Sequence, residues 1–263
     1  METELTKEDF EDLAYAKSLL ENPSLATKIV NAFGKPIESG IELLPDRWTS
    51  VIQHSSRKAL EKALDFALRT LERRTELPDI AFHRYSLAAS GGLAGAIGLV
   101  ALPLELPFST VVLLRSIADI AKSEGEDIRN PETKMNLLEV FALGGGTRKD
   151  DSAETGYYTV RASLATLVSD AARYPVGARV SGKTSPVLIR FIDSIAARFG
   201  VVVSEKAMAT LVPVIGAAGG AIVNMIFFNH FQDVARGHFI IRRLERKYGR
   251  EYIHSEYDKI ESG

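Results

Sequence analysis

Two long stretches without a charged residue dominate this chain, one of 20 residues at positions 85–104 and one of 23 residues at positions 207–229. Each is long enough to cross a hydrocarbon core of about 30 Å as a helix. Each also repeats glycine at a spacing of four, which lets two helices approach closely. The glycines that we expect at close helix contacts, or lining space for an apolar ligand, are Gly91, Gly95, Gly98, Gly216 and Gly220.

The small residues in these runs bear on whether they meet lipid or protein. Alanines and glycines occur on all sides of both predicted helices, a pattern that favours helices surrounded by other helices over helices that face lipid. Pro103 and Pro213 interrupt the runs, although membrane helices tolerate proline. We therefore favour a buried pair of core helices, with conditional insertion into a bilayer as the alternative.

Apolar residues recur at helical spacing through almost every other segment. Helix starts are predicted at Thr6, with Asp9 three residues later, and at Asn130, which precedes a proline. The predicted helices that follow the first one span residues 45–74, 108–125, 131–143, 158–174, 185–199 and 204–248, the last divided near Pro213 or its glycines. Pro103 and Pro107 predict a break before position 108, and the three valines at 201–203 are the one strand-like stretch.

This pattern predicts an all-α protein, a single multi-helix domain of about eight to ten helices with the two Gly-rich apolar helices at its centre. Residues 1–44 form a looser helical segment in this interpretation, residues 45–252 the helical domain and residues 253–263 a C-terminal tail.

Composition excludes several classes of function. The chain has no cysteine, so thiolate catalysis, disulfides and cysteine-ligated metals are ruled out. The formal net charge is −2, which provides no basic field for a nucleic acid. The first residues are acidic and polar where a secretory signal would be basic and then apolar, so we expect a cytoplasmic protein.

Residues 177–184 read Gly-Ala-Arg-Val-Ser-Gly-Lys-Thr and match the phosphate-loop pattern of nucleotide-binding proteins. A true phosphate loop follows a buried strand, whereas a predicted helix end and Pro175 come before this one. We interpret the match as a helix–helix loop. A nucleotide site at Gly182, Lys183 and Thr184 remains the alternative that would make the protein an enzyme.

No other pattern selects a catalytic or metal site. His230 and Asp233 share a helix face and would need a third ligand to hold a metal. Several acids lie in apolar surroundings, and buried ion pairs, with Arg115 or Arg190 as partners, are their simplest role. These acids are Glu105, Asp119, Glu139 and Asp193. We expect no cofactor.

Residues 236–250 hold six lysines or arginines against one glutamate. An apolar stripe runs along one side of this predicted helix, and Arg236, Arg243, Lys247 and Arg250 form a largely separate basic stripe. A basic amphipathic helix directly after an apolar run suits an anionic membrane surface. The alternative is a solvated charged face on a helix whose other side joins the core.

Several blocks of sequence resemble the EcsC protein family of bacteria. The blocks include Leu-Glu-Leu-Pro at 104–107, Leu-Glu-Val-Phe-Ala-Leu-Gly-Gly at 138–145, Arg-Phe-Gly-Val at 198–201 and His-Phe-Gln-Asp at 230–233. The resemblance covers roughly residues 44–252. It implies a helical, membrane-associated protein from a family named for a gene beside an ABC-type exporter system, and it supplies no catalytic residues.

The resulting hypothesis is a non-enzymatic protein at the inner face of the cell membrane, which contacts the membrane surface or a membrane protein and is linked to an exporter system. Two alternatives stay open: a carrier that binds a lipid between its Gly-rich helices, and an enzyme with a nucleotide or metal site. Nucleic acid is not an expected partner.

Overall fold

The computed structural model describes residues 4–21, 25–33, 46–69, 101–145, 156–174, 185–211 and 216–260. Every regular element in these ranges is a helix, which confirms the predicted all-α fold. In chain order they are α1 (Lys7–Leu20), α2 (Leu25–Phe33), α4 (Asp46–Arg69), α6 (Leu102–Ser123), α7 (Pro131–Leu143), α8 (Tyr157–Ala172), α9 (Pro186–Leu211), α10 (Gly216–Tyr248) and α11 (Arg250–Lys259).

Two helix starts agree with the sequence prediction because a capping side chain fixes each of them. The Asp9 N–H at the start of α1 donates to Thr6 Oγ1 over 3.2 Å. The Glu132 N–H at the start of α7 donates to Asn130 Oδ1 over 2.9 Å. Such caps satisfy amide groups that have no partner inside the helix, so their signal is local and readable from sequence.

The predicted break at Pro103 and Pro107 is wrong, because α6 begins at Leu102 and runs through both prolines. Pro103 sits in the first turn, where its missing N–H would have had no intrahelical partner. Pro107 lies inside the helix and removes one backbone hydrogen bond. Leu106 before it and Leu113 after it are fully buried, so core packing outweighs the lost bond.

The predicted gap between helices at residues 200–203, around the three strand-like valines, is also wrong, because α9 continues through all three valines to Leu211. Val202 and Val203 are buried in the main core. Placing a β-branched residue in a helix costs roughly 0.5 kcal/mol. Burial of a whole apolar side chain stabilises the fold by about 1.5–3 kcal/mol, which outweighs that cost.

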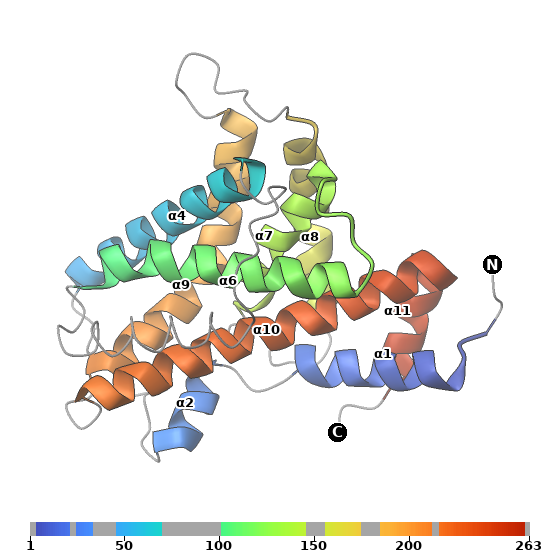
Figure 1. The fold of residues 1–263 in the computed structure, drawn as a ribbon, viewed down its shortest axis with the longest axis horizontal. Coiled ribbons are helices and arrows are strands. Elements are labelled where there is room, and N and C mark those ends of the chain that lie inside the picture. Colours follow the sequence, from blue (N-terminus) through green and yellow to red (C-terminus); the bar gives the residue numbers. More distant parts are fainter. Residues whose placement is uncertain are drawn as a thin grey trace.

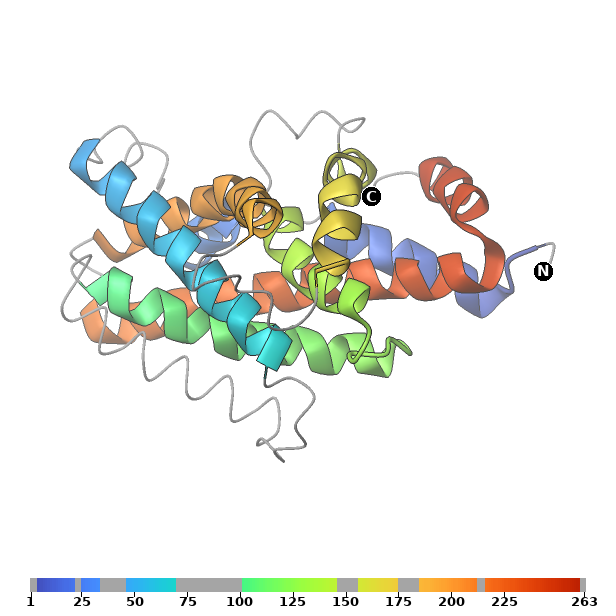
Figure 2. The same ribbon diagram turned by 90° about the horizontal axis from the view of Figure 1, so that it is seen from above.

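Helix α10 is the longest of the described helices, with α6 beside its first half and α1 beside its second half (Figures 1 and 2). Helix α4 packs across α6 and α9, and α7 lies between α8, α9 and α10. The main core gathers apolar side chains from α2, α4 and α6 to α10. A second, smaller cluster joins α1, α8 and α11 to the C-terminal part of α10.

The structure describes the second uncharged run more fully than the first. Most of the first run, including Gly91, Gly95 and Gly98, lies outside the described residues, as do Gly182, Lys183 and Thr184 of the predicted loop. The second run is divided between the end of α9 and the start of α10, where Gly216 is the first residue of α10 and Gly220 is buried. Within the described ranges, no helix combines the length and the hydrophobicity that crossing a membrane requires.

Candidate functional site

The basic side of α10 lies against acidic residues from two other elements. The Lys247 ammonium is 2.8 Å from an oxygen of Asp9 on α1. Arg243 donates to Asp12, one turn further along α1, and its Nε is 2.8 Å from Glu124 at the end of α6. Both cations are only partly exposed, at 34% for Arg243 and 43% for Lys247. The structure therefore pairs these two of the four predicted anion-contacting residues with acids from other elements.

The acidic partner Asp9 is held in its charged form. Burial alone would raise the pKa of its carboxyl, but hydrogen bonds from Lys247, Tyr248 and Thr6 outweigh that effect and bring the pKa to about 2. The Tyr248 hydroxyl donates to Asp9 over 2.6 Å. Arg250, the fourth predicted contact, is exposed at the first residue of α11.

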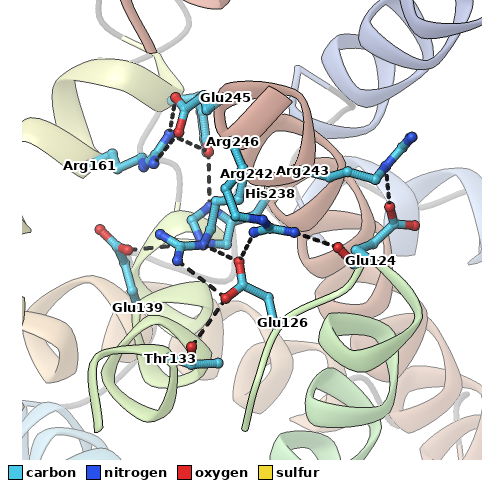
Figure 3. A network of polar contacts seen from close by, with 11 residues as sticks. Glu124, Glu126, Thr133, Glu139, Arg161, His238, Arg242, Arg243, Glu245 and Arg246 are labelled. Carbon is cyan, nitrogen blue, oxygen red and sulfur yellow. Dashed lines mark hydrogen bonds and ion pairs between the residues drawn. The ribbon is translucent and has the colours of Figure 1, made fainter. Parts of the chain in front are cut away.

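A second set of arginines on the same helix meets the turn between α6 and α7 (Figure 3). Arg242 Nε donates to Glu126 over 2.7 Å, and Arg246 donates to the same carboxylate. Thr133 donates to it from α7 over 3.1 Å. Burial would raise the pKa of Glu126, but the arginines outweigh it and the pKa is lowered. The turn is thereby fixed to α10.

Beneath these pairs, a buried polar cluster joins α7, α8 and α10 (Figure 3). Arg161 of α8 forms a two-pronged ion pair with Glu245 of α10, at 2.7 and 2.6 Å. The Tyr157 hydroxyl is 2.9 Å from His238 Nδ1, and His238 Nε2 is 3.9 Å from a carboxylate oxygen of Glu139. His238 and Glu139 are almost fully inaccessible to solvent.

The Tyr157 hydroxyl links Arg161 to His238 through hydrogen bonds. Arg161 donates to the Tyr157 oxygen over 3.2 Å, and the hydroxyl of Tyr157 has one proton of its own to donate. When this hydroxyl donates to His238 Nδ1, the neutral imidazole carries its hydrogen on Nε2, which faces Glu139. Burial raises the pKa of Glu139 to about 7 and lowers that of His238 well below its usual value.

A carboxyl that titrates near neutral pH beside an imidazole has the properties of an acid–base pair. Substrate would have to reach it, however, and Tyr157, His238 and Glu139 are all buried behind α11 and the Arg161–Glu245 pair. Tyr157 packs on Tyr257 of α11 with ring centroids 6.2 Å apart. The arrangement therefore fits a structural core of polar groups that fixes the positions of three helices.

The predicted metal pair takes part in other contacts. His230 Nε2 lies 2.8 Å from the Gly144 carbonyl oxygen at the end of α7, and burial lowers the pKa of His230 to about 4. Asp233 is 3.3 Å from Lys28 of α2 and 3.8 Å from Arg236, the remaining residue of the predicted basic stripe. Among the described residues, no group of three or more His, Asp or Glu could hold a metal ion.

Large apolar side chains are exposed where α6 and α10 begin, at the same end of the molecule (Figures 1 and 2). Leu104 is 82% exposed and Phe108, one turn further along α6, is 52% exposed. Ile222 on α10 is 47% exposed. We call these three residues the apolar end. Leu104 and Ile222 belong to the two uncharged runs of the sequence, and Phe108 lies four residues after the first run.

A buried ion pair ties this end together from within. Lys206 of α9 lies 2.9 Å from Glu105 of α6, and Asn224 of α10 donates to the same carboxylate over 3.2 Å. Lys206 also lies over the ring of Phe227, 4.6 Å from its centre. The predicted role of Glu105 in a buried ion pair is confirmed, with a lysine as its partner in place of an arginine.

The fold and these contacts define a class of protein: an all-helical bundle in which cations of α10 pair with acids of other helices and three exposed apolar residues lie at one end. Comparison with known families places it more closely, because the model of the EcsC protein family matches residues 9–244. The chain belongs to the EcsC protein family. No curated protein and no solved structure matches it.

Sequence reasoning missed the cluster around His238. Its members lie on three helices, and Glu139 and His238 are 99 positions apart, so no local motif connects them. The one available signal was an acid inside an apolar stretch, between Leu138 and Val140. That signal indicated a buried carboxyl but not its neighbours.

Proposed function

We propose that this protein acts without catalysis as a peripheral membrane protein, which docks on the cytoplasmic face of a bilayer with its apolar end. The observation that supports the proposal is the grouping of Leu104, Phe108 and Ile222 at one end of the molecule, at 82%, 52% and 47% exposure. Exposed apolar groups of this size are a feature of interaction surfaces. The family resemblance points in the same direction.

The energetics suit reversible attachment. Full burial of one large apolar side chain contributes about 1.5–3 kcal/mol, so three side chains that enter the interface provide binding in a reversible range. The buried Glu105–Lys206 pair keeps α6, α9 and α10 together beneath this end, so the side chains are presented on a fixed surface. No exposed cation is needed for this contact, and we expect it to resist salt.

Sedimentation with vesicles tests the proposal. Wild-type protein should co-sediment with phosphatidylcholine vesicles to the same extent in low and in high salt. The variant Leu104→Ser/Phe108→Ser should bind at least about tenfold more weakly, because it loses two of the inserted side chains. Wild-type protein that stays in the supernatant, or a double variant that sediments like wild type, would overturn the proposal.

The matched control is Phe10→Ser/Tyr15→Ser. These two residues are exposed to a similar degree, at 46% and 49%, and lie on α1 away from the apolar end. The control removes two large exposed side chains elsewhere, so it should bind vesicles like wild type. The lipid-carrier alternative depends mainly on Gly91, Gly95 and Gly98, which lie outside the described residues.

A further inference from the structure

Helix α1 lies along the basic side of α10 in an antiparallel arrangement (Figure 1). Near the start of α1, Asp9 meets Lys247, and one turn later Asp12 meets Arg243. Near the end of α1, Leu20 and the Ala16 carbonyl approach Gly237 so closely that a Cβ there would lie 2.7 and 2.9 Å from them. Acidic residues of α1 thus cover two of the cations that an anionic surface would contact.

The contacts at Arg243 have the form of anion recognition. Three carboxylates surround its guanidinium: Asp12 and Glu124, which it contacts directly, and Asp9 at 3.7 Å. A guanidinium with several donors binds phosphate in the same geometry as carboxylate. Burial would lower the pKa of Arg243, and the surrounding acids raise it instead, so the cation stays charged under all ordinary conditions.

We propose that the basic side of α10, at Arg243 and Lys247, is a second membrane-contact surface that binds anionic lipid headgroups, and that α1 is its displaceable intramolecular cover. Lipid phosphates would replace the carboxylates of Asp9 and Asp12. The inference rests on the proposed membrane association but uses another face of the molecule and another lipid chemistry. The apolar end docks on any bilayer, whereas this surface selects negative charge.

The apolar contacts of α1 oppose its displacement. Leu13 and Ala16 are fully buried against α10 and α11, so α1 stays in place on a neutral surface. A strongly anionic surface attracts Arg243 and Lys247 and repels the exposed acids of α1, such as Glu8 and Glu11, at the same time. The cover is therefore expected to leave only where the density of negative lipid is high.

Two variants loosen the cover by independent means. Asp9→Asn/Asp12→Asn removes the competing charge and keeps the side-chain size. Gly237→Ala changes no charge, and the added methyl group forces α1 away from α10. Hydrogen exchange of residues 7–20 reports whether α1 has loosened. The charge-matched control is Glu61→Gln/Asp119→Asn, which removes two acids from ion pairs on α4 and α6.

The measurement is co-sedimentation with vesicles of phosphatidylcholine alone and of phosphatidylcholine with phosphatidylserine. Both loosened variants should bind the anionic vesicles at least about tenfold more tightly than wild type in low salt, and the gain should disappear in 1 M NaCl. Addition of Arg243→Gln/Lys247→Gln to either variant should remove the gain. The control variant should show none.

Three results would overturn the inference. The first is unchanged exchange of residues 7–20 in both loosened variants, because α1 would then not be displaceable. The second is faster exchange without tighter binding to anionic vesicles. The third is a gain that survives the loss of Arg243 and Lys247. Failure of the apolar end is recognised separately, as loss of binding to neutral vesicles.

Discussion

At the scale of single residues, Glu139 and His238 stand out, because burial disfavours the charged form of each. The pKa of Glu139 is raised from 4.5 to about 7, so the folded protein binds more protons than the unfolded chain between those pH values. The stability that this group contributes is present below pH 4.5 and is lost as the pH rises through about 7. His230 and His238 act in the opposite direction, because their lowered pKa values favour the folded state above pH 6.5.

The variant Glu139→Gln should therefore change how stability depends on pH. Glutamine stays neutral, so the variant avoids the penalty that wild type incurs as Glu139 ionises in its buried site. From pH 5 to pH 8, the free energy of unfolding of the variant should rise relative to wild type by roughly 1–3 kcal/mol. Urea unfolding at pH 5, 6.5 and 8 measures the difference. Parallel pH curves for the two proteins would contradict the predicted titration, and Glu61→Gln at an exposed position serves as the control.

What the sequence predicts at this scale is the kind of contact but not the partner. Glu105 stands among apolar residues, and a buried carboxylate requires a cation, so an ion pair could be expected. Its partner, Lys206, is 101 positions away and is set by how α6 and α9 cross. Lys247 and Arg243 were read as an exposed basic stripe, because the acids opposite them belong to α1, more than 230 residues earlier in the chain.

At the scale of elements, helix ends are predictable where a local side chain fixes them and unpredictable where packing decides. Thr6 and Asn130 cap the helices that follow them, and both starts were predicted. Pro107 and Val202 lie inside helices against their local preference, because each neighbours residues that the core buries. The packing partners that override these preferences come from other helices, and a single sequence does not reveal them.

The contact between Gly144, at the end of α7, and Phe231 of α10 allows such packing to be tested. A Cβ on Gly144 would lie 2.5 Å from the ring of Phe231, which is fully buried, so neither side can move freely. Gly144→Ala should lower the free energy of unfolding by about 1–3 kcal/mol. Thermal or urea unfolding monitored by circular dichroism measures the change.

The control substitution is Gly200→Ala in the middle of α9. The nearest atom to an added Cβ there is Ser56 Oγ at 3.9 Å, which is an ordinary contact. Alanine is the better helix former by roughly 0.5–1 kcal/mol, so this variant should be as stable as wild type or slightly more stable. If both substitutions destabilise the protein equally, the close contact with Phe231 does not explain why position 144 needs a glycine.

At the scale of the whole molecule, the first and last described helices support each other. Helix α1 contacts α11 as well as α10, and the smaller apolar cluster joins all three with α8. The match to the EcsC family ends at residue 244, before α11 begins, so α11 lies outside the part that the family model covers. Its attachment depends on a few contacts, and His254 of α11 stacks on Tyr158 with ring centroids 3.9 Å apart.

Lys17 of α1 contacts the end of α11. Its ammonium donates to the Tyr257 carbonyl over 3.0 Å and to the Ile260 carbonyl over 2.7 Å, at the C-terminal end of α11. Lys17→Met keeps the apolar stem of the side chain and removes these donors. Hydrogen exchange in residues 250–259 should then accelerate by on the order of tenfold, while exchange in α7 stays at the wild-type rate, because local opening of α11 does not require the main core to open. Equal acceleration in α7 would mean that the two clusters unfold as one unit and that the ends of the chain are integral to the core.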